Sequence, residues 1–294
     1  MRRAVVDVGS NSVLLTVAER AEAGWQTLRE TSTVTALGEG VKTDGMMREP
    51  NMAATLQALR DAFAIAEQEG AELRAYGTMA LRIAANQPVF LNLAERQQTP
   101  LKVISGDTEA ELGMESVTTD PQFSAYPRIA VVDVGGHSTE IGVTDKSFLR
   151  SFPVGTLGLR SKFLADETPS GGAILQASAV LDEAFDGIDA PGCPVVGLGA
   201  SVTNLASIRA ELREWDPHAV HGAPLDYEEI SRFVGRTMRM TDAERALMVG
   251  IEKGRERTVH IGALIVERAL LALKAEVIFV SVRGWRHAML DRWL

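Results

Sequence analysis

The chain has 294 residues, which is enough for one large or two modest domains, and its 46% hydrophobic content supports a sizeable core. The formal net charge of −9 argues against nucleic acid as the main partner, so any polyanion must bind at a local basic site. The single cysteine excludes an internal disulfide and is typical of a reducing cytoplasm, and the chain shows neither a secretory leader nor an apolar run of ~20 residues, so we expect a cytoplasmic protein that does not cross a membrane.

The first half of the chain alternates strand and helix patterns. One helix is expected where Met52, Leu56, Leu59, Phe63 and Ala66 recur at steps of four and three residues, which is the spacing of an amphipathic helix. Clustered glycines before this helix indicate a loop. The expected strands are short apolar runs at about 3–8, 12–18, 25–30, 73–76 and 101–104, and a turn and a helix follow each of the last two.

The second half repeats this plan. Its expected strands lie at about 128–134, 139–143, 148–153, 194–198 and 277–281, and its helices at about 174–188, 201–213, 226–239, 258–274 and after Gly284. Strands interleaved with helices indicate α/β layering, and the hairpin-like strands that open each half indicate mixed sheets. The segment 119–128, with two prolines and no periodicity, is the expected junction, so we divide the chain into domains 1–124 and 125–294.

Six residues occur twice in this chain. Ala4–Gly9 reads Ala-Val-Val-Asp-Val-Gly, and the same letters return at Ala130–Gly135, 126 residues later; the match resumes at Ser12 and Ser138. One copy alone would mean little, because similar runs occur by chance in many α/β proteins. Two copies at the spacing of a domain indicate two like-folded halves that face each other across a phosphate site, with two unrelated buried strands as the alternative.

Each repeated strand leads into a turn of small and hydroxyl-bearing residues. Such a turn leaves backbone N–H groups that can cradle a phosphate, and the aspartate before it can hold a hydrated divalent cation. Asp7 and Asp133 end buried strands, where an unpaired carboxylate is costly, so each of them needs a metal or a backbone cap. Taken alone, each loop also fits an ordinary hairpin turn.

These loops resemble the phosphate loops of the actin/Hsp70/sugar-kinase superfold. More narrowly, Val6–Ser12 resembles the opening D-[IV]-G-S-N-S of the exopolyphosphatase/guanosine pentaphosphate phosphatase family. Further blocks resemble that family in the same order, so the resemblance covers nearly the whole chain. The blocks are Gly77–Asn86, Ile104–Ala110, Asp133–Glu140 and Gly197–Ser201, with weaker echoes at Pro153–Gly155, Gly262–Ala263 and Ser281–Arg286.

The resemblance implies an α/β fold of two actin-like (ribonuclease H-like) domains, each a mixed sheet flanked by helices, with the active site in the interdomain cleft. It implies hydrolysis of the terminal phosphoanhydride bonds of inorganic polyphosphate, of guanosine pentaphosphate (pppGpp), or of both. It also makes a homodimer an expectation. Two alternatives stay open: a kinase or ATPase of the same superfold, and a sensor that binds polyphosphate or an alarmone with little turnover.

The same resemblance assigns catalytic residues. Glu109 falls on the second acidic position of S-G-x-E-E-A and would orient or deprotonate the attacking water, while Glu140 falls on the glutamate of D-x-G-G-G-S-T-E. Arg82 would clamp an anion, because a guanidinium matches phosphate oxygens in two-point contacts. Without the resemblance, Glu109 also fits a first-turn acid favoured by the helix dipole, Glu140 a solvated strand residue and Arg82 a surface salt-bridge partner.

The remaining expected site residues would hold a metal and the phosphate. By the resemblance, Mg²⁺ or Mn²⁺ is expected on the hard oxygen ligands Asp7, Asp133 and Glu140. The five histidines lack metal-ligand spacing, so no zinc site is expected. The expected phosphate-binding residues are Gly9, Ser10, Asn11, Ser12, Gly135, Gly136, His137, Ser138, Thr139, Gly199 and Ser201.

A chain without a basic overall charge needs a local patch to grip polyphosphate. The candidate contributors form two groups, for which solvated surface positions are the alternative. They are Arg150, Arg160 and Lys162 in one group, and Lys253, Arg255 and Arg257 in the other.

The chain departs from the family pattern at four places. His137 replaces the third glycine of the second loop, where it adds either bulk near the phosphate or a donor to it, and Thr108 replaces the first acid of the E-E pair. Gly197–Ser201 reads Gly-Leu-Gly-Ala-Ser in place of a G-G-T ending, and Ala36 stands where a basic residue often precedes L-G-x-G. Each departure is tolerable alone, and together they leave altered substrate preference or reduced turnover as an open alternative.

Overall fold

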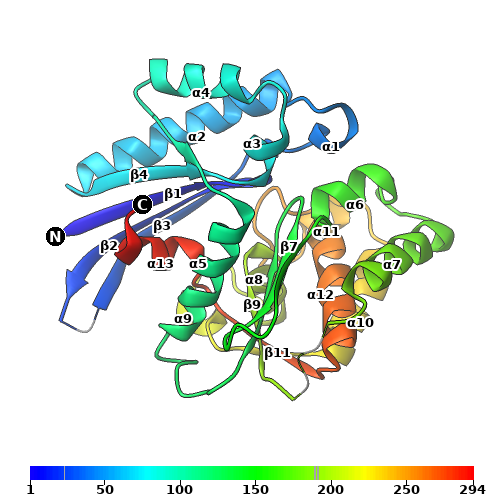
Figure 1. The fold of residues 1–294 in the computed structure, drawn as a ribbon. Coiled ribbons are helices and arrows are strands. Elements are labelled where there is room, and N and C mark those ends of the chain that lie inside the picture. Colours follow the sequence, from blue (N-terminus) through cyan, green and yellow to red (C-terminus); the bar gives the residue numbers. More distant parts are fainter. Residues whose placement is uncertain (23, 189, 191) are drawn as a thin grey trace. The chain divides into compact units, whose positions relative to one another are not determined.

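The computed structural model describes residues 1–22, 24–188, 190 and 192–294, and these residues pack into two compact units. Unit 1 comprises Met1–Leu112 and Trp285–Leu294, and unit 2 comprises Gly113–Gly284. This packing differs from the expected ranges 1–124 and 125–294, because residues 113–124 pack with unit 2 and the end of the chain returns to unit 1. Figure 1 traces both units, which are described separately below.

Unit 1 is built on a five-stranded mixed sheet in the order β3-β2-β1-β4-β5. β1 runs antiparallel to β2 and parallel to β4, so the sheet is mixed as expected. The strands are β1 (Arg2–Val8), β2 (Ser12–Ala21), β3 (Gly24–Val34), β4 (Glu72–Gly77) and β5 (Lys102–Val103). The helices are α1 (Val41–Asp44), α2 (Glu49–Gln68), α3 (Met79–Ile83), α4 (Gln87–Arg96), the start of α5 (Gly106–Thr118) and α13 (Trp285–Arg292).

The central strand β1 buries both of its faces. Val6 packs with Leu59 of α2 on one face, and Val5 packs with Met289 of α13 on the other. Figure 1 shows α2 and α13 on opposite sides of this strand. Because side chains alternate along a strand, Asp7 lies on the same face as Val5, which is the face that α13 covers.

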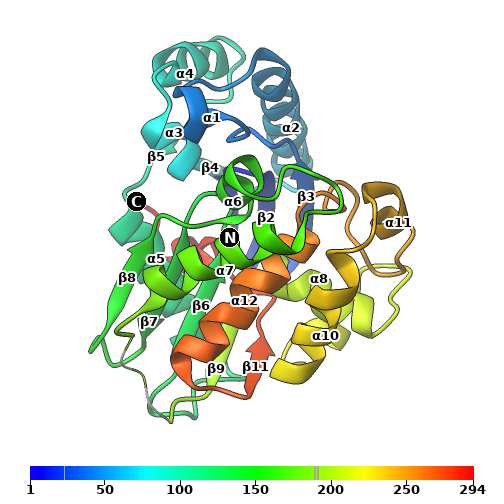
Figure 2. The ribbon, with the colours of Figure 1, turned by 90° about the vertical axis from the view of Figure 1, so that its right-hand side faces the viewer.

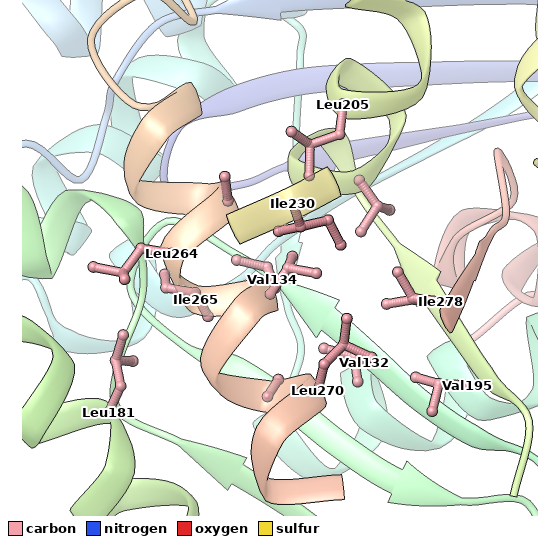
Figure 3. Close-up of a cluster of buried hydrophobic side chains, with 14 of the residues drawn as sticks. Val132, Val134, Leu181, Val195, Leu205, Ile230, Leu264, Ile265, Leu270 and Ile278 are labelled. Atoms are coloured by element: carbon pink, nitrogen blue, oxygen red, sulfur yellow. The ribbon is translucent and has the colours of Figure 1, made fainter. Parts of the chain in front are cut away.

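Unit 2 contains a six-stranded mixed sheet in the order β10-β11-β9-β6-β7-β8, with helices packed on it (Figure 2). Side chains of β6 such as Val132 and Val134 meet Ile265 and Leu270 of α12 in its core (Figure 3). Its strands are β6 (Ala130–Val134), β7 (Thr139–Val143), β8 (Leu149–Phe152), β9 (Val195–Leu198), β10 (Pro224–Asp226) and β11 (Val277–Val280). Its helices are α6 (Thr156–Lys162), α7 (Gly171–Phe185), α8 (Ala200–Arg209), α9 (Pro217–Val220), α10 (Tyr227–Thr237), α11 (Asp242–Ala246) and α12 (Val259–Leu273).

The repeated sequence forms the same structure twice. In each sheet the repeated strand is central, pairs antiparallel with the strand that follows it, and pairs parallel with a later strand. The Gly9 N–H donates to the Ser12 carbonyl at 2.9 Å, and the Gly135 N–H donates to the Ser138 carbonyl at the same distance. The prediction of two like-folded halves, with actin-like mixed sheets flanked by helices, is therefore confirmed.

Some elements differ from the expected ones. The predicted loop before α2 contains the short helix α1, and α6 and the edge strand β10 were not anticipated. The predicted helix at 201–213 ends earlier, at Arg209, and Glu211 takes a left-handed φ of 50° that cannot continue a helix. Within the residues that the structure covers, no helix combines the length and the apolar character needed to cross a membrane.

Candidate functional site

The first phosphate loop, residues 9–11, is held through its carbonyl groups. The Ser10 carbonyl accepts a hydrogen bond from the Gly38 N–H at 2.8 Å, and the Asn11 carbonyl accepts two, from Thr35 at 3.0 Å and Ala36 at 2.9 Å. Ala36 takes a left-handed φ of 49° to make this contact. The segment that resembles L-G-x-G thus supports the loop, because its N–H groups already occupy the carbonyl oxygens of Ser10 and Asn11.

Two polar atoms of this loop region are buried without a hydrogen-bond partner among the described residues. They are Oδ1 of Asp7 and Nδ2 of Asn11, an acceptor and a donor. A buried polar group left unpaired costs about 1–3 kcal/mol. A ligand that offers an oxygen to Asn11 and a cation or a donor to Asp7 would remove both costs, and a metal-bound phosphate is such a ligand.

The pKa of the Asp7 carboxylate in unit 1 is strongly perturbed. Burial raises its pKa to about 6, against the opposing effects of the Arg286 charge, a hydrogen bond from the Trp285 side chain, and the Arg82 charge. The sequence predicted a metal or a backbone cap for this carboxylate. The partners found are instead an indole and two guanidinium groups, two of which belong to α13. Trp285 and Arg286 were not recognised from the sequence, and the only signal was the weak family echo at Ser281–Arg286.

Arg82 and Glu109, the expected anion clamp and the expected base, form an ion pair. Nη1 of Arg82 lies 2.9 Å from Oε2 of Glu109 and also donates to the Ile104 carbonyl at 2.9 Å. The two side chains are only 18% and 15% exposed, so this pair is largely shielded from solvent. The pairing fixes the orientation of the Glu109 carboxylate within unit 1.

Thr108 has a local structural role that explains its presence beside Glu109. At the start of α5, the Thr108 N–H donates to the Ser105 hydroxyl oxygen at 3.1 Å, and the two hydroxyl oxygens lie 2.9 Å apart. Ser105 thereby caps the helix whose first turn carries Glu109. A threonine in place of the family's first acid therefore still supports the helix start that positions Glu109.

The second phosphate loop is also held by its carbonyls. The Gly135 carbonyl accepts from the Thr156 N–H at 3.1 Å, and the Gly136 carbonyl accepts from the Leu157 N–H at 2.7 Å. Gly155 must be a glycine, because a Cβ atom there would lie 2.6 Å from the backbone of Gly136. His137, whose side chain replaces the family's third glycine, is only 2% exposed and is therefore packed into unit 2.

Two expected carboxylates of unit 2 lie side by side on its sheet. Asp133 on β6 pairs in register with Glu140 on β7, so both side chains share one face. The Ser151 hydroxyl donates to Oε1 of Glu140 at 2.7 Å. Glu140 is buried, which rules out a solvated strand position.

The glycine turn after β9 lies next to the Asp133 carboxylate. Gly199 has a φ of 81°, and a Cβ atom there would lie 2.9 Å from Oδ1 of Asp133, so only glycine suits this position. The Ser201 hydroxyl lies 3.4 Å from the Val134 carbonyl, to which it donates. The Thr139 hydroxyl donates to the Val154 carbonyl at 2.7 Å, so this expected phosphate ligand serves the backbone here.

The carboxylates of the expected site suit an ion such as Mg²⁺ or Mn²⁺ that keeps waters and substrate oxygens among its ligands. Within the described part of the chain, no group of three or more His, Cys, Asp and Glu side chains could hold a metal ion by itself. Magnesium is often bound through one or two carboxylates together with waters and substrate phosphates. The paired Asp133 and Glu140, and separately the partnerless Oδ1 of Asp7, fit that mode. Whether all three carboxylates serve one ion stays a prediction.

The expected basic patch residues have local contacts. The Arg255 side chain is 12% exposed and pairs with Glu252 at 2.9 Å. The Arg150 guanidinium lies over the Phe152 ring, 5.2 Å from its centroid, and the Lys162 ammonium lies over the ring of its neighbour in sequence. A polyphosphate-binding role for these residues therefore stays a prediction.

Comparisons with known proteins agree on one family. A sequence model described as the Ppx/GppA phosphatase family matches residues 16–294. The chain is 25% identical to "Exopolyphosphatase 2" of Mycobacterium tuberculosis, over 99% of this chain and 96% of that protein, and 27% identical to "Exopolyphosphatase 1" of Mycobacterium leprae, over 100% and 90%. The crystal structure of the Aquifex aeolicus member of the Ppx/GppA protein family matches with a TM-score of 0.81 at 27% identity, over 100% of this chain and 97% of that one.

Because the Asp7 carboxylate is buried, we expect the folded protein to become more stable when this charge is removed. Because the pKa of Asp7 in the folded chain lies above its ordinary value of 3.8, the cost of burying the charge is absent below about pH 4, grows between pH 4 and 6, and is complete above pH 6. We expect Asp7→Asn, without divalent metal, to raise the free energy of unfolding by up to about 3 kcal/mol at pH 8 and to change it little at pH 4. Denaturant unfolding at the two pH values measures this difference.

The matched control is Asp166→Asn, since Asp166 is exposed and its carboxylate stays in contact with water in the folded chain. This variant should match the unsubstituted protein at both pH values. An Asp7→Asn protein that is less stable than the parent at pH 8 would contradict the account of Asp7.

Proposed function

Since the chain belongs to the Ppx/GppA phosphatase family, we propose that it hydrolyses the terminal phosphoanhydride bond of inorganic polyphosphate and releases phosphate. The exopolyphosphatase names of its mycobacterial relatives support this substrate. The observation that carries the proposal is the pair of buried atoms that lack a partner among the described residues, Oδ1 of Asp7 at the end of β1 and Nδ2 of Asn11 in the first loop. A terminal phosphate with its counter-cation offers the partners that both atoms lack.

The reaction needs a water molecule in line with the bond that breaks. In the proposal, the water oxygen attacks the terminal phosphorus, the bond to the bridging oxygen breaks, and the shortened chain leaves with that oxygen. Glu109 orients the water and accepts its proton, which then passes to solvent. The Arg82 contact at 2.9 Å keeps the Glu109 carboxylate oriented before the substrate arrives.

Charge on the transferred phosphoryl group must be neutralised during this step. Mg²⁺ held by Asp7, or by Asp133 and Glu140, would supply positive charge at the phosphate oxygens. Backbone N–H groups of the first loop and the Asn11 amide would donate to those oxygens, and the carbonyl groups of this loop are already fixed by a neighbouring segment. The loop is therefore organised before substrate binds, which lowers the cost of ordering it.

Guanosine pentaphosphate is a second candidate substrate, since its terminal phosphate is joined by the same kind of bond and the family description includes GppA. One assay distinguishes the candidates: phosphate release from long polyphosphate, tripolyphosphate, pppGpp and ATP, each with Mg²⁺ and with a chelator. We expect Mg²⁺-dependent release from polyphosphate. Release from ATP alone would favour an ATPase or kinase of the same fold, and binding of polyphosphate without release would favour a sensor.

Glu109 gives a direct test of the proposed mechanism. We expect Glu109→Gln to bind polyphosphate normally and to lose turnover by ~100-fold or more, the usual effect of removing a general base. Glu111→Gln is the control, since Glu111 lies on the same helix and its carboxylate pairs with Arg292 at 3.5 Å. Near-parental turnover of Glu109→Gln in steady-state kinetics would remove Glu109 from the mechanism.

A substitution of His137 tests what the histidine does in place of the family's third glycine in the second loop. If its imidazole donates to a phosphate oxygen, His137→Gly should weaken polyphosphate binding by about 1–3 kcal/mol. If the ring only crowds the loop, the same change should raise turnover or tighten binding. We expect the weaker binding, and titration calorimetry with a thermal melt as the folding control distinguishes the outcomes. Unchanged binding and turnover would contradict both roles.

A further inference from the structure

We propose that the C-terminal helix α13 is part of the phosphate site of unit 1, with Trp285 and Arg286 as positioning residues for the Asp7 carboxylate. This inference rests on the proposed function and adds two residues to it. Neither residue follows from the two repeated loops, since α13 lies outside the repeated segments Ala4–Gly9 and Ala130–Gly135.

The sheet of unit 1 brings α13 to Asp7. Val5 and Asp7 lie on one face of β1, and Val5 packs in the same cluster as Tyr76, Trp285 and Met289. Trp285, the first residue of α13, is only 3% exposed, so its ring is fixed by packing. Its indole can act only as a donor, and it donates to the Asp7 carboxylate while Oδ1 of Asp7 stays without a partner. The indole thus holds one side of the carboxylate and leaves one oxygen for a ligand.

Arg286 is itself held in place by neighbouring strands. Its Nε donates to the Thr16 hydroxyl oxygen at 3.0 Å, and its Nη2 pairs with Oε1 of Glu30 at 3.3 Å. Thr16 in turn donates to the same Glu30 oxygen at 2.9 Å. The Arg286 side chain is 11% exposed, and its charge is the largest of those that stabilise ionised Asp7. A guanidinium fixed by β2 and β3 therefore lies near enough to the carboxylate at the end of β1 for its charge to lower the pKa of Asp7.

Stacked rings and guanidinium groups dock the far end of α13. The Arg3 guanidinium lies 5.3 Å from the Trp25 ring centroid and 4.5 Å from that of Trp293, and the Arg74 guanidinium lies 4.7 Å from Trp293. Tyr76 and Arg74 donate to the backbone of the last residues. This docking holds α13 on the sheet at its C-terminal end, while Trp285 and Arg286 act at its N-terminal end.

Two tryptophan variants, one at the first residue of α13 and one just after its last residue, test the role of Trp285. Partners that orient a metal-ligating carboxylate typically change metal affinity or activity 10- to 100-fold when removed. We expect Trp285→Phe, which keeps a ring but lacks the N–H, to lower both polyphosphate turnover and Mn²⁺ affinity, measured by electron paramagnetic resonance, by ~10-fold or more. Trp293→Phe is the control, because its N–H donates to Glu72 and not to Asp7.

The Asp7→Asn background separates positioning from general damage. There Trp285→Phe should cause no further loss of Mn²⁺ affinity, because the carboxylate that it positions is gone. Arg286→Met should lower turnover ~10-fold or more, Arg286→Lys should restore part of it by keeping the charge, and Arg292→Met on the same helix should not lower it. Thermal melts of each variant show that the chain remains folded.

The outcomes distinguish this inference from the proposed function. An active parent protein whose Trp285→Phe variant matches Trp293→Phe in turnover and Mn²⁺ affinity would overturn the inference and leave the function intact. A parent protein that releases no phosphate from any of the substrates would overturn the proposed function, and the positioning role with it.

Discussion

Burial of the Asp7 carboxylate at the end of β1 is the constraint on which the site of unit 1 depends. A central strand that packs on both faces leaves this residue only 8% exposed, and burial raises the pKa of its carboxylate to about 6 despite two nearby guanidinium groups. Stability alone would favour a neutral residue here. Interactions from α13 limit the free-energy cost of burying this charge. A bound cation would reduce the cost further, so the residue that destabilises the fold is also the one proposed to bind the metal.

The two units share the structure of their glycine turns but differ in how they hold their carboxylates. In both, a hairpin turn closes through a glycine N–H, and a neighbouring segment occupies the loop carbonyls. Their carboxylates are held differently: Asp7 meets an indole and guanidinium groups, whereas Asp133 pairs in register with Glu140 beside the glycine turn. This division suggests separate tasks for the two copies, with the expected base Glu109 belonging to unit 1.

Local sequence patterns predicted most of this fold, because strand alternation, helical spacing and the internal repeat are short-range signals. The paired strands and the two glycine turns are found where the repeat places them. The Trp285 hydrogen bond and the Arg286 charge that act on Asp7 join opposite ends of the chain, and no local pattern encodes such an interaction. The sequence shows Thr108 in place of an acid, and its hydrogen bond to Ser105 at the start of α5 becomes visible only in the structure. The roles of individual site residues came from family resemblance, and their chemistry stays a prediction.

The proposed reaction removes phosphate one unit at a time from the end of a polyphosphate chain. Phosphorus-31 NMR of long polyphosphate with the protein and Mg²⁺ tests it most directly, because terminal, internal and free phosphate give separate signals. The account predicts that free phosphate grows at the expense of internal phosphate while the terminal signal stays constant, since each cleavage creates one new end for the one removed. Growth of the terminal signal before free phosphate, or no change in any signal, would contradict it.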